Sequence, residues 1–257
     1  KNQTVQDSIY EWTKRGKIGG LMFHDLPVET FVERTTESKK LAQFPLFIGT
    51  DEKVALNNQF SDAVHFPEPA TIASLSNKKQ QQKLSDLYVK QCQLLGINFC
   101  MSPSLFENKK NTSTYHYQAF EANSTSSLKR SHALLANLNQ NNILSIGDNF
   151  SDYYQIQQDT TGFLDRVLYK YYRLTSHGLS GLKMDEQVFN FDGWNSLQPY
   201  FLQHYIQRNL SFKGLIVAEK SDDVFMDRLI HSGVDLFIIN DDVNAAYAAL
   251  KRWVDMG

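Results

Sequence analysis

The chain has 257 residues, a formal net charge of −2, and 42% hydrophobic and 21% charged residues. These values are typical of a globular protein with a sizeable core, and they exclude the strongly basic balance of a nucleic-acid-binding domain. No apolar run approaches the roughly 20 residues that a membrane span needs, so no membrane span is expected.

The chain has two cysteines, Cys92 and Cys100, which are too few for a disulfide framework. Cys92 falls in a helical pattern and Cys100 in a strand pattern. We therefore expect two buried free thiols rather than a disulfide, and the cysteines do not decide the compartment.

Short apolar runs that end in polar residues recur along the chain, as in parallel strands that are covered on both faces. They predict strands at 17–25, 44–51, 96–104, 142–149, 214–220 and 234–241, with a weaker candidate at 172–178. Amphipathic helical patterns alternate with these runs, and both the first and the last pattern are helical.

This alternation predicts an α/β fold with a parallel sheet. Seven strands with a helix at each end fit a TIM-type (β/α) barrel that lacks its first strand within this segment. We expect residues 1–257 to be a single domain of a longer polypeptide, with a strand from elsewhere between the strands at 19–24 and 235–240. Two long polar segments, 107–128 and 149–165, follow strand ends, where a barrel builds its active-site face.

Several strand ends carry a family resemblance, in order across nearly the whole chain. They read "GKIGGLMFHD" (16–25), "PLFIGTDEKVALNNQFSDAVHFPEPATIAS" (45–74), "LGINFCMSPSLFE" (95–107), "FKGLIVAEK" (212–220) and "SGVDLFIINDDVNAAYAAL" (232–250). Together they resemble the N-terminal barrel domain of glycoside hydrolase family 3, of the bacterial β-N-acetylglucosaminidase type.

The resemblance assigns roles to single positions. Glu219 stands where the family has its nucleophilic aspartate, and Asp51 keeps an acid of the loop after the second strand. Gln118 replaces an arginine that grips the substrate. The loop that carries the acid/base histidine corresponds to "LSIGDNFSDYYQ" (144–155), which has no histidine and leaves Asp148 or Asp152 as the acid.

Two further residues are candidates for sugar binding. His177 matches a later strand-end histidine of the family, although a structural histidine is the more ordinary interpretation. Trp194, with Phe189 and Phe191 nearby, suggests either a stacking surface for a sugar or an anchor for a connection. The histidines do not show metal-site spacing, and neither a metal nor another cofactor is expected.

A retaining glycosidase needs a carboxylate nucleophile and a proton donor. The altered motifs predict a degenerate β-N-acetylhexosaminidase-like domain, inactive or strongly impaired, that binds a cell-wall glycan containing N-acetylglucosamine or serves as a scaffold. Glu219 itself remains open between a solvated strand-end acid and a nucleophile.

Two alternatives remain. One is an active β-glycosidase with Glu219 as nucleophile and Asp148 or Asp152 as acid. The other is a structural domain that positions a fused catalytic module. The resemblance also implies a location in the bacterial cell envelope.

Overall fold

The structure is a computed structural model of the 257-residue chain. It describes residues 2–52, 56, 59–75, 77–103, 124–148, 169, 171–184, 188–189, 194–195, 199, 202–219, 229–240 and 242–256.

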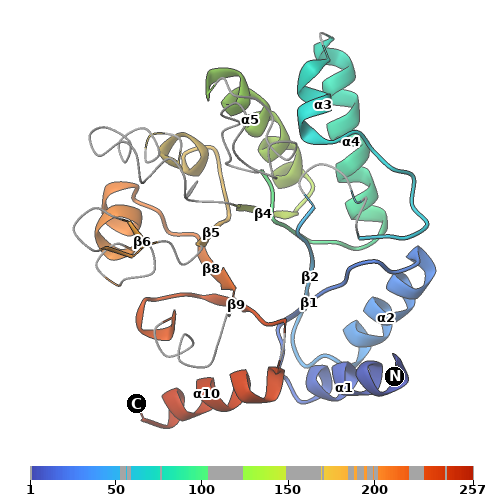
Figure 1. Ribbon diagram of the computed structural model, residues 1–257, viewed down its shortest axis with the longest axis vertical. Coiled ribbons are helices and arrows are strands. Elements are labelled where there is room, and N and C mark those ends of the chain that lie inside the picture. Colours follow the sequence, from blue (N-terminus) through green and yellow to red (C-terminus); the bar gives the residue numbers. More distant parts are fainter. Residues whose placement is uncertain are drawn as a thin grey trace.

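Seven parallel strands form one sheet that curls around a central axis, with helices on its outer side (Figure 1). The order in the sheet is β1-β2-β3-β4-β5-β8-β9, so the strands follow one another in space as they do along the chain. Their bounds are β1 Gly20–Met22, β2 Phe47–Thr50, β3 Phe99–Cys100, β4 Leu144–Gly147, β5 Gly181–Met184, β8 Leu215–Glu219 and β9 Leu236–Ile238. This arrangement confirms the predicted TIM-type α/β fold.

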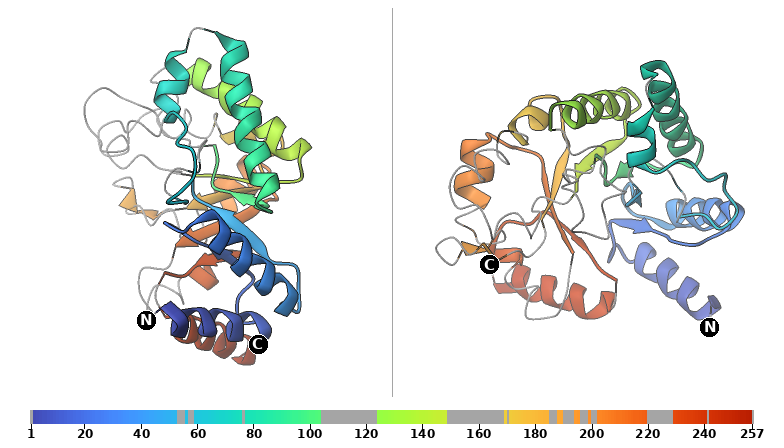
Figure 2. Two further views of the ribbon diagram at one scale, coloured as in Figure 1. Left: turned by 90° about the vertical axis from the view of Figure 1, so that its right-hand side faces the viewer. Right: turned by 45° about the horizontal axis from the view of Figure 1, so that its top comes forward.

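The helices lie outside the strands and cover the sheet's outer face (Figures 1 and 2). Their bounds are α1 Asn2–Lys14, α2 Val28–Leu41, α3 Pro69–Ser74, α4 Lys78–Leu94, α5 Ser124–Gln140, the π-helix η2 Leu202–Asn209 and α10 Val243–Met256. Between β5 and η2, a two-stranded antiparallel ribbon joins β6 Val188–Phe189 to β7 Trp194–Asn195.

Alternate residues of each strand pack on opposite faces of the sheet, as the two-residue period of a strand requires. One set fills the barrel interior and forms a single apolar cluster; its members are Met22, Phe47, Phe99, Met101, Leu144, Ile146, Leu215, Val217, Leu236 and Ile238. The other set packs outward against the helices, with Ile216 and Ala218 of β8 in one cluster and Ile48 and Cys100 in another. The same alternation, continued past the end of each strand, determines which strand-end residues face the barrel interior.

The predicted strand at 172–178 is wrong. Residues 171–175 are helical, and the fifth strand is β5, further along the chain. Tyr171 and Leu174 are both buried in one cluster, which is the three-residue spacing of a helix rather than the two-residue spacing of a strand. The aromatic and threonine content of this segment is typical of strands. Its structure is nevertheless a helix, because a helix buries Tyr171 and Leu174 on the same side.

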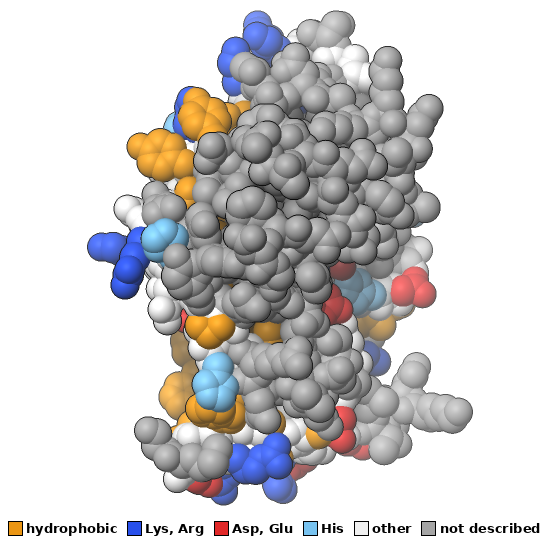
Figure 3. Space-filling model, turned by 60° about the vertical axis from the view of Figure 1, so that its left-hand side comes forward, with side chains coloured by type: hydrophobic (Ala, Val, Ile, Leu, Met, Phe, Trp, Pro, Cys, Tyr) orange, Lys and Arg blue, Asp and Glu red, His pale blue; other side chains and the backbone are white. Residues whose placement is uncertain are grey.

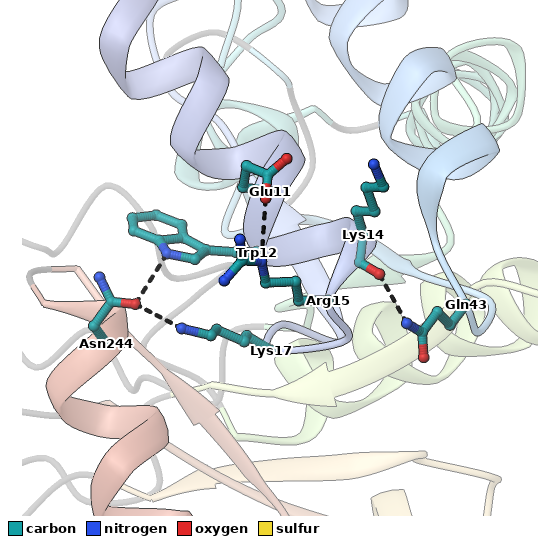
Figure 4. Close-up of polar contacts among 7 residues, drawn as sticks. All are labelled: Glu11, Trp12, Lys14, Arg15, Lys17, Gln43 and Asn244. Atoms are coloured by element: carbon teal, nitrogen blue, oxygen red, sulfur yellow. Dashed lines mark hydrogen bonds and ion pairs between the residues drawn. The ribbon is translucent and has the colours of Figure 1, made fainter.

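The sheet has two edges, at β1 and at β9, and these strands do not pair with each other in the described part of the chain. On the outside, α1 and α10 approach each other here: Asn244 Oδ1 accepts hydrogen bonds from Trp12 Nε1 (3.2 Å) and Lys17 Nζ (2.9 Å), as Figure 4 shows. The further bonds in Figure 4 stay within the α1 region or join it to the loop after α2. A strand supplied from elsewhere to this gap remains a prediction.

Cys92 of α4 and Cys100 of β3 are both buried and free, with their sulfurs 3.9 Å apart. This confirms the prediction of two buried thiols. The adjacent Tyr88 hydroxyl donates a hydrogen bond to the carbonyl oxygen of Glu52, at 2.9 Å, and so ties α4 to the segment after β2.

Helices with the length and apolar composition to cross a membrane are absent from the described part of the chain.

Candidate functional site at the carboxyl ends of the strands

Polar side chains continue the inward-facing positions where the strands end. His24 comes two residues after Met22, Asp148 two after Ile146, and Asn240 two after Ile238. By the same spacing, Asp51 follows Gly49 and Glu219 follows Val217. Because all seven strands are parallel, these residues share one end of the barrel, above its apolar interior, where barrel enzymes carry their active sites.

Lys183 belongs to the same group, although its position is one inward-facing residue before the level of Glu219. It lies on β5 opposite Val217 of β8, and therefore on the inner face of the sheet. Its Nζ is 3.6 Å from Asp148 Oδ1, and the two side chains are only 14% and 6% exposed. Such a buried ion pair offsets its desolvation by mutual attraction, and each charge depends on the other.

The same ammonium contacts Glu219. Lys183 Nζ lies 3.4 Å from Glu219 Oε2, whereas the other oxygen, Oε1, accepts a hydrogen bond from Asn240 Nδ2. The partners come from β5 and from the end of β9, the two neighbours of β8 in the sheet. Glu219 is thus held on both carboxylate oxygens, although its side chain is 44% exposed.

A separate pair lies at the ends of the first two strands. His24 Nδ1 is 3.7 Å from Asp51 Oδ1, and both side chains are about half exposed. The turn after β2 is fixed by the Thr50 hydroxyl, which accepts a hydrogen bond from the Glu52 backbone N–H at 3.1 Å. A histidine oriented by a carboxylate is an arrangement that general acid–base catalysis uses.

The site therefore has two parts. A row of alternating acceptors and donors, Asp148–Lys183–Glu219–Asn240, runs along β4, β5, β8 and β9, and the His24–Asp51 pair lies at β1 and β2. Groups of three or more His, Cys, Asp or Glu side chains that could hold a metal ion do not occur among the described residues.

The sequence matches the family described as glycosyl hydrolase family 3 N terminal domain over residues 2–257. The chain belongs to this family. A search of curated protein sequences found no match.

Solved structures of family 3 proteins have the same fold. A β-glucoside phosphorylase, BglX, bound to 2FGlc has 16% identity and a TM-score of 0.79, over 93% of this chain and 50% of that one. NagZ from Neisseria gonorrhoeae, in complex with N-trifluoroacetyl-D-glucosamine, has 16% identity and a TM-score of 0.69, over 91% of this chain and 82% of that one. A family 3 β-N-acetylglucosaminidase from Paenibacillus sp. str. FPU-7 has 13% identity and a TM-score of 0.82, over 98% of this chain and 55% of that one.

At these identities the likeness shows the fold alone, and the names span a phosphorylase and a β-N-acetylglucosaminidase. The family 3 barrel therefore does not by itself decide the reaction, which depends on the residues of the site. This chain spans half the length of the BglX chain.

The structure brings three of the predicted site residues of this family 3 domain, Asp51, Asp148 and Glu219, to the carboxyl ends of the strands. His177 is not among them. It comes after the helical residues 171–175 and before β5, so it lies toward the amino ends of the strands. There it stacks on His132 of α5, with ring centroids 3.9 Å apart, and its Nδ1 lies 2.6 Å from the Arg173 carbonyl oxygen.

The remaining predicted residues are not placed at the site. Gln118 and Asp152 lie outside the described residues. Trp194 begins β7 and pairs with Phe189 in the antiparallel ribbon. Sugar contacts of Gln118 and Trp194 remain predictions.

Sequence reasoning missed Lys183, Asn240 and the pairing of His24 with Asp51. The signal for Lys183 is a charged residue inside "GLKM" (181–184), which became visible only once the fifth strand was placed there. His24 and Asn240 lie inside the predicted strands 17–25 and 234–241, and the two-residue period places them on the same face as Met22 and Ile238.

On the face in Figure 3, the described Lys and Arg side chains lie in separate places rather than in one patch. This distribution accords with the net charge of −2.

Proposed function

We propose that this family 3 domain binds a sugar of the N-acylglucosamine class at the carboxyl ends of its strands and hydrolyses the glycosides of that sugar slowly. The observation that carries the proposal is the engagement of both Glu219 oxygens, by Lys183 and by Asn240. Family membership and the N-trifluoroacetyl-D-glucosamine complex of the similar NagZ structure support the ligand class.

A retaining glycosidase attacks the anomeric carbon with one oxygen of its nucleophilic carboxylate. In this chain, attack by Glu219 requires breaking its contact with Lys183 or with Asn240. Glutamate also carries one methylene more than the aspartate that the family resemblance places here, and misplacement of about 1 Å can cost about a hundredfold in rate.

Proton donation is the second difficulty. The Lys183 ammonium beside Asp148 stabilises the ionised carboxylate, and an ionised carboxylate accepts hydrogen bonds but has no proton to donate. Asp148 is therefore poorly suited to protonate a leaving group.

The test measures binding and turnover on one preparation. Calorimetry with N-acetylglucosamine should show saturable binding, and an aryl β-N-acetylglucosaminide should be cleaved at least about a thousandfold more slowly than by an intact relative. We take the lower end of the combined losses because groups that act together are not additive. Absence of sugar binding, or turnover near that of the relative, would overturn the proposal.

The His24–Asp51 pair favours a second candidate, an active glycosidase with a relocated proton donor. His24 is exposed at the site end of the barrel and lies beside a carboxylate that can orient it. If this candidate holds, His24→Gln abolishes turnover of substrates with poor leaving groups but spares those with activated ones.

The wider setting is also a proposal drawn from the family resemblance. It places the domain in the bacterial cell envelope and in a longer polypeptide, where it binds glycan or positions a catalytic module. Fractionation of the native host, with detection by an antibody against this domain, tests the compartment and the size of the polypeptide together.

A further inference from the structure

We propose that Lys183 is a positioning residue that holds Glu219 in an orientation unsuited to attack, so that this lysine controls the reactivity of Glu219. The inference rests on the proposed function, because it concerns the same sugar site.

The first argument is geometric. Lys183 lies opposite Val217 in the β5–β8 register, whereas Glu219 stands two residues beyond Val217 on the same inner face. The lysine side chain therefore reaches Glu219 from below, at 3.4 Å from Oε2. Any ligand at the strand ends meets the Glu219 carboxylate from the other side.

The second argument concerns how firmly the lysine is placed. Its side chain is 14% exposed and also contacts the Asp148 carboxylate, which is 6% exposed. A lysine anchored by a buried carboxylate has few alternative rotamers, so its contact with Glu219 persists without ligand. Glu219 is thereby tied to a buried ion pair that joins β4 and β5.

The third argument is electronic. An ammonium beside a carboxylate oxygen withdraws charge from the atom that would attack, and the attack then has to break the ion pair. Removing the ammonium leaves Oε1 with Asn240 but releases Oε2. The freed oxygen is the atom that we expect to react.

The experiment traps the attack itself with an activated 5-fluoro N-acetylglucosaminide, which keeps the 2-acetamido group and carries a dinitrophenolate leaving group. One Glu219 oxygen forms a bond to the anomeric carbon, the bond from that carbon to the leaving oxygen breaks, and dinitrophenolate departs with the electron pair. Because this leaving group needs no proton, the reaction reports on the nucleophile alone and not on a missing acid. Mass spectrometry of the digested protein identifies the labelled residue and its rate of labelling.

The variants separate positioning from stability. Lys183→Met alone removes the cation beside the buried Asp148 carboxylate and is expected to destabilise the fold. Asp148→Asn/Lys183→Met removes both charges together and is the decisive variant. Asp148→Asn alone removes the anchor of Lys183 but keeps its ammonium in reach of Glu219, so it separates the effect of the anchor from that of the ammonium. Lys183→Arg keeps a cation at the same position and is the conservative replacement.

We expect the double variant to label Glu219 at least about tenfold faster than the unchanged chain, since a displacement of the reacting atom on the order of 1 Å changes rates by up to about a hundredfold. Lys183→Arg should label as slowly as the unchanged chain, and Asp148→Asn, which keeps the ammonium but holds it less firmly, should label more slowly than the double variant.

Equal labelling by the double variant and the unchanged chain, or equal acceleration by Asp148→Asn alone, would overturn the role of Lys183. Labelling at a residue other than Glu219 would overturn it as well. The proposed function fails separately, if N-acetylglucosamine does not bind the unchanged chain, and the inference then falls with it.

Discussion

Lys183 Nζ and Asp148 Oδ1 lie 3.6 Å apart in the barrel interior, with both side chains almost fully shielded from water. The pair joins β4 to β5 at the level where the apolar interior gives way to the polar strand ends. Because Lys183 also contacts Glu219, this ion pair links the packing of the barrel interior to the candidate site.

Replacing one member of this ion pair should destabilise the domain more than replacing both. Lys183→Met alone takes its ion-pair partner from the buried Asp148 carboxylate, and we expect it to lower the free energy of unfolding by about 3–5 kcal/mol. Asp148→Asn alone should cost less, because Lys183 keeps its contact with Glu219. The double variant Asp148→Asn/Lys183→Met should be close to the unchanged chain. Urea denaturation of the unchanged chain, the two single variants and the double variant measures the interaction energy of Asp148 and Lys183. If the losses of the two single variants add up in the double variant, the two side chains do not form a stabilising pair.

Much of the barrel could be predicted from sequence because buried parallel strands are short apolar runs that periodicity finds directly. The fifth strand was missed because "YRLTSHG" has strand-like composition, whereas Tyr171 and Leu174 are buried on one helical stripe. The family resemblance led to Asp51, Asp148 and Glu219.

Lys183 and Asn240 could not be assigned in this way, because their contact with Glu219 depends on which strands are neighbours and on their register. Neighbour relations between strands are a property of the folded sheet. Once the order β5-β8-β9 is known, both residues follow from the two-residue period.

Gly181, at the start of β5, allows a close approach between strands. A Cβ added there would lie 2.5 Å from Ile146 Cδ1 and 2.9 Å from the backbone oxygen of Leu215. We expect Gly181→Ala to lower the free energy of unfolding by about 1–3 kcal/mol, because a backbone atom cannot give way as a side chain can. Gly19→Ala is the matched control, since a Cβ there meets nothing within 4 Å. Equal midpoints in urea for the two variants would show that the sheet relaxes around the added methyl group.

His132 should make stability depend on pH. Burial, and then the neighbouring His177 and Arg173, lower the pKa of His132 below its ordinary value of 6.5. The unfolded chain therefore binds the proton more readily than the folded one, so this contribution to stability is present above the ordinary value and is lost as the pH falls below it.

The measurement is the urea midpoint as a function of pH for the unchanged chain and for His132→Gln. We expect the variant to lose part of the decline in stability on the acid side of neutrality. His65→Gln, at an exposed position, serves as the control. A decline of the same size in His132→Gln would exclude this histidine as its source.

Cys92 and Cys100 should be inert in the native state. Both thiols are buried, and the hydrogen bond with Cys100, followed by burial, raises the pKa of Cys92 well above its ordinary value. Since the thiolate is the reactive form, a thiol-specific reagent should modify them only as fast as the protein opens. Modification rates that stay constant as urea is raised below the unfolding transition would argue against this burial.

Glu219→Asp tests how much of the proposed impairment of hydrolysis comes from the extra methylene. The shorter side chain draws the carboxylate back by about 1 Å, which weakens its contacts with Lys183 and Asn240 and approaches the side-chain length of the family's nucleophile. With an aryl β-N-acetylglucosaminide that has a poor leaving group, we expect a gain below about tenfold, because general acid catalysis worth about 10²–10⁴-fold is still absent. With an activated leaving group the same variant should gain more, since departure then needs no proton. Glu37→Asp on the exposed side of α2 makes the same shortening away from the site and is the matched control. Full recovery with the poor leaving group would show that a proton donor is already in place, and attention would turn to His24 beside Asp51.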